Sequence, residues 1–444
     1  MLTPRTQQDT AAVNVQQVID RQDFGPFHWF VTAICAVAVL MDGFDAQVMG
    51  FVAPAIAGDW HIARGGLGPI LVAGQVGMLA GALVFGPLAD RVGRKSVLLF
   101  CTLWFGVASL LTARADSISS MLILRLVTGF GLGGTLPNAI ALTSEYMPQR
   151  LRATGVMMMF SGFSVGAAAG GFVAAGLIAR LGWRSVFVVG GVLPCLTAVL
   201  LLWLPESIRF LVLKGGQAEA IAKLLKRVAP SISIAPGTSF VTAEHRAKGF
   251  LVRNLFTEGR TGMTLLLWAI YFLSLLDLFF LTSWLPTILH DAKFSIQQAI
   301  LITTMLQVGG TAAALILGRF IDRASHKVLG WAYLGAVAGV FLIGAAASSV
   351  ALEALAVFAA GFCVVGAQTG ANSLAAQCYP TAIRSTGSGW ALGMGRLGSI
   401  AGPMLGGLLL SSDLEIGRVF WVAAVPPLLA ALAAFVVSPR GERT

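Results

Sequence analysis

The sequence predicts an all-α integral membrane protein with twelve transmembrane helices in two pseudo-symmetric six-helix halves. Three observations support this prediction. The 444 residues are 57% hydrophobic and only 11% charged, a composition typical of polytopic membrane proteins and not of soluble domains. Apolar runs long enough to cross a bilayer, for which about 20 residues are needed, recur along the whole chain. Separate stretches of the chain also repeat one another at one constant offset.

The predicted spans are bounded by charged residues, prolines and glycines. Several are rich in glycine, which suits close packing of helices in lipid. The first 26 residues are polar and show no signal-peptide pattern, so we expect the first span to be retained. The twelve predicted spans are about 27–53, 66–88, 97–113, 121–145, 153–179, 185–204, 263–289, 297–318, 328–349, 353–377, 385–411 and 417–437.

An internal repeat divides the chain. The stretch GPLADRVGRK at 86–95 recurs as GRFIDRASHK at 318–327, which is 232 positions later. The same offset aligns EYMPQRLRATG at 145–155 with QCYPTAIRSTG at 377–387. One ungapped register through separate segments predicts two homologous halves. We expect an N-terminal cytoplasmic segment, an N-terminal bundle, a cytoplasmic linker, a C-terminal bundle and a cytoplasmic tail at 1–26, 27–204, 205–260, 261–438 and 439–444.

The net charge of +10 is explained by orientation in a membrane. With both termini in the cytoplasm, 22 of the 30 Lys and Arg residues lie on the cytoplasmic side, as the positive-inside rule requires. We therefore expect no nucleic-acid partner. The five cysteines lie in or at the ends of spans without a CxxC motif, which favours packing roles over metal binding. The chain shows no catalytic constellation, so we expect neither an enzyme nor a cofactor.

Several motifs resemble those of known transporters. Two six-helix halves with the pattern G-x-x-x-D-R-x-G-R-K between the second and third spans resemble the major facilitator superfamily. Within it, DGFD, GLGGTLPNAIALTSEYMPQRLR, PESIRFL, GMGRLGSIAGP and the N-terminal VNVQQVIDRQDFGPFHW are similar to the aromatic acid:proton symporters. This resemblance implies the major facilitator fold and proton-driven import of benzoate-type carboxylates. It also implies a bacterial inner membrane location, with protons, the small aromatic carboxylate and the lipid bilayer as partners, and we expect a functional monomer.

Two acids in the first span are the leading site candidates. Asp42 and Asp45 lie three positions apart, hence on one helix face, in an apolar run where a carboxylate costs about 2.5–3.5 kcal/mol. Arg125 lies early in the fourth span, and its long side chain can reach inward to Asp45. We predict that these three residues form the proton-coupling site, in which protonation releases the ion pair. The alternative is a permanent structural pair between the two helices.

Arg396, near the middle of the eleventh span, is the predicted receptor for a carboxylate, because its helix contains no acid. The alternative is an ion pair with Asp277 in the seventh span, the repeat mate of Asp45. Asp277 is itself a weaker substrate-binding candidate. The other predicted substrate-binding residues are polar or aromatic, and for each of them plain packing is the alternative: Gln75, Asn138, Gln307, Gln368, Asn372, Phe280, Trp284 and Trp390.

Charged residues at the cytoplasmic ends of the spans are the predicted gate. In the family that the motifs resemble, this cluster latches the two halves together when the site faces outward. The alternative is a set of solvated loop charges. The predicted gating residues are Gly86, Asp90, Arg91, Arg94, Glu145 and Arg152 in the first half, and Asp322, Arg323, His326 and Arg384 in the second.

The sequence thus predicts a proton-coupled symporter that imports a small aromatic carboxylate by alternating access. The substrate class comes from the resemblance, because composition and repeat alone indicate only a polytopic transporter. Three alternatives stay open. The same fold can carry an aliphatic, dicarboxylic or sugar acid, it can work as an efflux antiporter, or the chain can be a membrane sensor that binds without transport.

Overall fold

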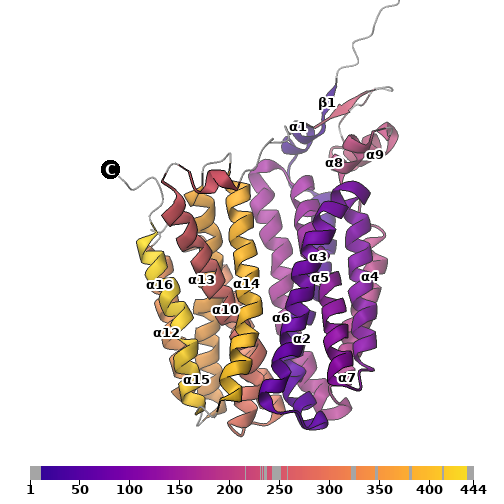
Figure 1. Cartoon of the computed structure of the whole chain (residues 1–444). Helices are drawn as coiled ribbons and strands as arrows, with labels where there is room; N and C mark the ends of the chain where they lie inside the picture. The colour runs from indigo at the N-terminus through magenta and orange to yellow at the C-terminus, as the bar shows by residue number, and fades with distance from the viewer. Residues whose placement is uncertain are drawn as a thin grey trace, which may run out of the picture.

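The computed structural model of this chain describes residues 12–215, 217–230, 232, 234, 238–242, 252–257, 259–321, 327–345, 349–379, 383–412 and 415–437. The described chain is almost entirely helical (Figure 1). The helices of the N-terminal half are α2 (Pro26–Trp60), α3 (Gly68–Val92), α4 (Arg94–Thr112), α5 (Ile118–Tyr146), α6 (Arg152–Leu181) and α7 (Arg184–Leu201). Those of the C-terminal half are α10 (Thr261–Asp291), α11 (Ile296–Ile321), α12 (Lys327–Ala345), α13 (Val350–Cys378), α14 (Arg384–Ser411), α15 (Ile416–Ala423) and α16 (Val425–Val436).

Each predicted span falls on one of these helices, except that the last is divided into α15 and α16. Within the described residues, nine helical segments are long and apolar enough to cross a membrane. The other three predicted spans coincide with α11, α12 and α14. The predicted all-α membrane fold is therefore confirmed, and the described helices are consistent with twelve spans.

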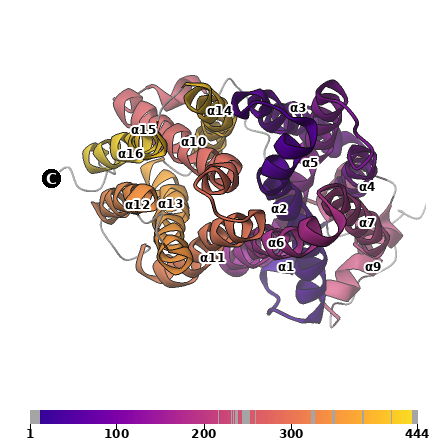
Figure 2. The same ribbon diagram turned by 90° about the horizontal axis from the view of Figure 1, so that it is seen from below.

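The two halves lie side by side as separate bundles, with α2, α3 and α6 of one facing α10, α11 and α14 of the other (Figure 2). Both halves use the same internal packing. In the first, α3 packs on α5 and α2 on α6, and in the second, α11 packs on α13 and α10 on α14. A Cβ added at Gly77 would lie 2.1 Å from the Leu126 carbonyl oxygen. At Gly309, which is 232 positions later, it would lie 2.2 Å from that of Phe358. The repeat in the sequence is thus a repeat in helix packing.

One end of the bundle carries the N-terminal segment and the linker helices, and we call it the linker end (top of Figure 1). The helices here are α1 (Val15–Asp20), α8 (Ile208–Lys214) and α9 (Ala218–Val228). The strand β1 (Val13–Asn14) pairs in parallel with β2 (Phe240–Val241). Short 3₁₀ turns occur elsewhere along the described chain: η1 (Arg64–Leu67, between α2 and α3), η2 (Gln149–Leu151) and η3 (Arg253–Leu255).

The described part of the predicted linker contains two short helices, α8 and α9. Val15 and Ile19 of α1 are buried in the same apolar cluster as Ile221 and Leu225 of α9. The N-terminal segment is therefore packed onto the linker. The pairing of β1 with β2 left no signal in the sequence, because a two-residue strand has no alternating pattern to detect.

At the end opposite the linker, the two halves approach each other closely. A Cβ added at Gly50 of α2 would lie 2.2 Å from the carbonyl oxygen of Thr282 in α10. One added at Gly171 of α6 would lie 1.8 Å from the Thr304 hydroxyl of α11. Only glycine permits such an approach of helix backbones. The halves are therefore in direct backbone contact at this end.

Toward the linker end, three glycines of α3 and α14 have open space beside them. Met78 of α3 contacts Arg396 of α14 near the middle of both helices. On the stripes that lead from these two residues toward the linker end lie Gly86, Gly389 and Gly393. A Cβ added at any of the three would meet no described atom within 4 Å. The interface is thus closed at one end and open at the linker end.

One methyl group at Gly166 of α6 should destabilise the first half, because its Cβ would lie 1.9 Å from the Leu40 carbonyl oxygen of α2. We expect Gly166→Ala to lower the thermal unfolding midpoint in detergent, since such overpacking costs about 1–3 kcal/mol. Gly176→Ala on the same helix is the matched control, because its Cβ would meet no described atom within 4 Å. Equal midpoints for the two variants would contradict the close α2–α6 packing.

Candidate functional site at the interface of the two halves

A buried ion pair joins α2 to α5. Arg125 Nη1 lies 3.4 Å from both carboxylate oxygens of Asp45. Only 3% of Arg125 and 6% of Asp45 are exposed. The contact expected from the sequence is present, although its role in proton coupling stays a prediction. Removing one partner of an ion pair this deep in an apolar bundle strongly destabilises the protein.

A second pair of opposite charges faces across the interface. Asp42 lies on α2 and is 2% exposed, and Arg396 lies on α14 of the other half and is half-buried. The charges of Asp42 and Arg396 interact electrostatically. The charge of Asp45, one turn away on α2, also acts on Asp42. The Oδ1 atom of Asp42 has no hydrogen-bond partner among the described residues. An acid of one half and a base of the other therefore lie within range of electrostatic interaction, although no ion pair or hydrogen bond joins Asp42 to Arg396 in the described chain.

Arg396 is only weakly satisfied by the protein. Its Nη1 contacts the Met78 sulfur of α3 at 2.9 Å, and a thioether is a weak acceptor. A guanidinium has five N–H donors in a planar fork. In the part of the chain that the structure describes, most of these donors stay available, so the group can bind a carboxylate in two-point fashion.

The alternative pairing of Arg396 with Asp277 is absent from this conformation. Asp277 lies on α10 and is 1% exposed, yet neither of its carboxylate oxygens has a hydrogen-bond partner among the described residues. Asp277 interacts electrostatically with Tyr333 of α12, which lies in the same half. The acid that interacts electrostatically with Arg396 is thus Asp42, a combination that the sequence did not indicate.

The predicted polar residues divide into two groups. Gln75 of α3 and Gln368 of α13 each have a buried Oε1 without a partner within the described chain. Asn138 donates to a carbonyl of its own helix at 2.7 Å, and Asn372 accepts from a tyrosine hydroxyl of α10 at 2.8 Å. Gln307 is buried in α11. The two asparagines thus each have a hydrogen-bond partner within the protein, whereas Gln75 and Gln368 offer free acceptors.

The three predicted aromatic residues do not form one surface. Phe280 and Trp284 are fully buried on α10, and the Trp284 indole donates to the Pro403 carbonyl at 2.8 Å in the packing between α10 and α14. Trp390 is 45% exposed near the start of α14, where it stacks on Trp268 with ring centroids 5.8 Å apart. They lie toward opposite ends of the second half, so they cannot all contact one small ligand.

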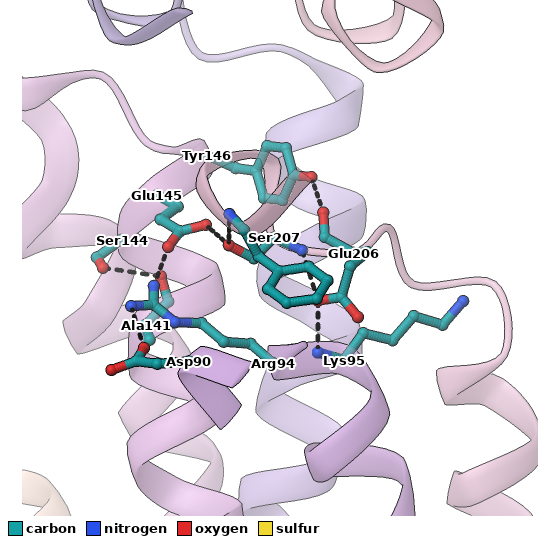
Figure 3. Close-up of polar contacts among 10 residues, drawn as sticks. Asp90, Arg94, Lys95, Ala141, Ser144, Glu145, Tyr146, Glu206 and Ser207 are labelled. Atoms are coloured by element: carbon teal, nitrogen blue, oxygen red, sulfur yellow. Dashed lines mark hydrogen bonds and ion pairs between the residues drawn. The ribbon is translucent and has the colours of Figure 1, made fainter. Parts of the chain in front are cut away.

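Part of the predicted gate forms a polar cluster at the linker end (Figure 3). Arg94, at the start of α4, pairs with Glu145 at the end of α5 and lies 3.5 Å from Asp90. The other oxygen of Glu145 accepts from the Ser207 hydroxyl at 2.6 Å. Ser207 is the N-cap of α8, so this network ties the linker to the first half.

Glu206 extends the cluster to the first turn of α4. It accepts from the backbone N–H of Lys95 at 2.9 Å and of Ser96 at 3.4 Å, as expected for an anion at a helix N-terminus. The Tyr146 hydroxyl donates to the Glu206 carbonyl oxygen. Neither Glu206 nor Ser207 was predicted as a gating residue, although both lie in the PESIRFL motif.

Among the described residues, the other charged side chains of the predicted gate show no contact with this cluster. Arg91 is exposed, and the Nε of Arg152 is buried without a hydrogen-bond partner among the described residues. Arg384 begins α14, but its side chain is not described. The other second-half candidates lie outside the described residues: Asp322, Arg323 and His326. The described cluster is therefore internal to the first half and its linker.

Two repeated helical bundles with buried charges meeting between them define a membrane transporter and not an enzyme. The chain belongs to the Major Facilitator Superfamily, whose pattern matches residues 35–257 and 267–444. It is 42% identical over 431 residues to the 4-hydroxybenzoate transporter PcaK of Pseudomonas putida, and the match covers 96% of each chain. It is 41% identical over 429 residues to the gallate transporter of the same species, which covers 95% of this chain and 94% of that one. These relatives confirm the resemblance drawn from the motifs.

A solved structure shares the fold. The xylose transporter XylE from E. coli, in a partially occluded inward open conformation, superposes with a TM-score of 0.73 at 17% identity. The match covers 95% of this chain and all of that one. The predicted major facilitator fold is thereby confirmed.

The polar cluster should hold α8 in place. We expect Glu145→Ala to speed tryptic cleavage within residues 208–228, because the variant loses both the Arg94 ion pair and the Ser207 hydrogen bond. Glu219→Ala is the control, since this acid lies in the first turn of α9 outside the cluster. The rate of cleavage in detergent, followed by mass spectrometry, measures the effect. Unchanged protection in Glu145→Ala would show that the cluster does not anchor the linker.

Proposed function

We propose that this protein is a proton-coupled symporter that imports a small aromatic carboxylate by alternating access. The observation that carries the proposal is the weakly satisfied Arg396 of one half, which interacts electrostatically with Asp42 of the other. The names of relatives at 41–42% identity, a 4-hydroxybenzoate and a gallate transporter, support the substrate class. The driving force is the proton gradient, without a cofactor.

Cargo and proton are linked through Arg396. The cargo carboxylate and the Asp42 carboxylate compete for the same guanidinium. A proton on Asp42 removes the competing negative charge, so proton binding favours cargo binding and cargo binding favours protonation. The free acceptors of Gln75 and Gln368 suit the hydroxyl groups of a hydroxylated ring.

Asp45 and Arg125 supply the conformational step. Protonation of Asp45 weakens its attraction to Arg125, which frees α2 within the first half. Because α2 packs against α10 of the other half, a change in α2 alters the contact between the halves. A proton that binds one arrangement better than the other shifts the equilibrium between them.

The open and closed ends of the interface support alternating access. The excess of Lys and Arg assigns the linker end to the cytoplasm, which makes this conformation inward-facing. The protein then spans a bacterial inner membrane with both termini in the cytoplasm. The outward-facing state then requires α3 and α14 to close at Gly86, Gly389 and Gly393. The small size of these residues permits that approach. The protein works as a monomer in this proposal, because each half supplies one member of the central charge pair.

Asp45→Asn should abolish accumulation of 4-hydroxybenzoate driven by an imposed proton gradient in proteoliposomes, because the amide cannot take up a proton. Counterflow exchange should persist, since it needs no net proton movement. Asp59→Asn is the matched control: Asp59 lies on the same helix and pairs with Arg184 at 3.2 Å, but it is half exposed and should be dispensable. Gradient-driven accumulation by Asp45→Asn at the wild-type level would refute the coupling role.

Arg396→Lys should weaken carboxylate binding by about tenfold or more, because an ammonium group lacks the planar fork. Binding to purified protein is measured by thermal shift with benzoate, 4-hydroxybenzoate and an aliphatic dicarboxylate. Arg418→Lys, at a residue paired with Glu415 on the surface, should bind like the wild type. Unchanged affinity in Arg396→Lys would move the anion site elsewhere, and preference for the dicarboxylate would overturn the aromatic substrate class.

A further inference from the structure

Arg125 is held by three residues besides Asp45, and we call them the Arg125 cradle: Thr112, Thr128 and Phe187. Arg125 Nη2 donates to the hydroxyl oxygens of Thr112 at 3.1 Å and Thr128 at 3.0 Å. The guanidinium carbon lies 4.8 Å from the centre of the Phe187 ring. These residues come from α4, α5 and α7, and all three are fully buried. The guanidinium therefore has supports on three helices.

The orientation of the two hydroxyl groups is fixed. Thr112 donates its proton to the carbonyl of Ala108 at 2.8 Å, and Thr128 donates to that of Leu124 at 2.7 Å. A hydroxyl group has one proton, so each oxygen can only accept from Arg125. Both threonines thus favour the cation whatever the protonation state of Asp45.

The contacts with the cradle are shorter than the contact with the acid. Arg125 lies 3.4 Å from the Asp45 oxygens, compared with 3.0 and 3.1 Å for the threonines. A guanidinium over an aromatic face gains further attraction. A buried cation left without partners would be costly. The cradle removes that cost when Asp45 is neutral.

The cradle and Asp45 belong to different parts of the first half. Among the helices, α4 packs on α5 and α7 of its own half, whereas α2 also packs on α10 of the other. Arg125 is therefore anchored to the interior of one half. Asp45 lies on a helix that forms the interface.

Other charged groups around Asp45 are few in the described chain. Asp42 shares α2, and Arg396 acts on it from α14. The acid of α10, Asp277, acts on Tyr333 in its own half. On α6 and α7 the charged side chains lie at the helix ends, at Arg152, Arg180 and Arg184, and the thiol of Cys195 lies further along α7. Arg125 is thus the cation in direct contact with Asp45.

We propose that Thr112, Thr128 and Phe187 are positioning residues that keep Arg125 in place when Asp45 takes up a proton, so that the acid and its helix are released and the arginine is not. This inference rests on the proposed proton-coupled transport. Without the cradle, Arg125 depends more strongly on a charged Asp45. Protonation of Asp45 then requires more acid, and the pH dependence of uptake moves to lower pH.

The test compares valine and serine variants at both threonines. We expect Thr112→Val and Thr128→Val each to lower the midpoint of initial uptake rate against pH by about one unit, the scale of one hydrogen bond to a charged group. The KM for 4-hydroxybenzoate, measured in counterflow, should stay unchanged. Thr112→Ser and Thr128→Ser keep the acceptor and should keep the wild-type midpoint.

Thr102→Val on α4 and Thr135→Val on α5 are matched controls. Both threonines are fully buried, and neither hydroxyl oxygen has a hydrogen-bond partner in the described chain. These variants should keep the wild-type midpoint. A shift in them equal to that in the cradle variants would overturn the inference, because it would reflect general loss of packing.

Phe187→Leu is the independent variant if a valine variant does not fold. It removes the aromatic face and no hydrogen bond, and it should lower the midpoint in the same direction. Wild-type midpoints in all folded cradle variants would overturn the inference while the proposed function stands, provided that wild-type uptake follows the proton gradient and Asp45→Asn loses it. If wild-type uptake ignores the gradient, the proposed function itself fails.

Discussion

The cost of burying charge in an apolar helical bundle is the constraint on which this structure depends. An isolated charge in such surroundings is expensive, so each one needs partners from neighbouring helices. Asp45 and Arg125 meet this requirement within the first half, with two threonines and a phenylalanine ring around the guanidinium. The positions of α2, α4, α5 and α7 relative to one another are therefore coupled to a single charged group.

The two central charge pairs differ in how well the protein satisfies them. Arg125 has an acid, two hydroxyl oxygens and an aromatic face, whereas Arg396 has a thioether and the distant charge of Asp42. The first arrangement supplies more partners within the described chain than the second, although Arg125 Nε has none. A binding site for an anion requires N–H donors that the protein itself leaves without acceptors, as it does at Arg396 in the described part of the interface between the halves. In the proposed function, the conformational step therefore falls to the first half's pair and recognition of the carboxylate to Arg396.

Glycine determines where the halves can touch. Within each half, the same glycine contacts recur at positions that the repeat relates, so each bundle is tightly packed and can move as a unit. Between the halves, close backbone contacts such as that of Gly50 with Thr282 are confined to one end. At the linker end Gly86, Gly389 and Gly393 face open space. In the proposed function, a relative rotation of the two bundles exchanges the closed end for the open one.

The sequence by itself determined the membrane fold, the spans, the repeat and the ionisable residues, because hydropathy, charge bias and periodicity are properties of the linear chain. It also indicated that Asp45 reaches Arg125, since helix direction and side-chain length limit the choices. The tertiary structure alone decided that Asp42 interacts electrostatically with Arg396, that Asp277 interacts with Tyr333 of its own half, and that Thr112, Thr128 and Phe187 surround Arg125. These contacts depend on the rotation of each helix about its axis and on the register between helices far apart in the chain. Because residues such as threonine occur on several faces of these apolar helices, the sequence pattern does not determine that rotation. Packing of the whole bundle does.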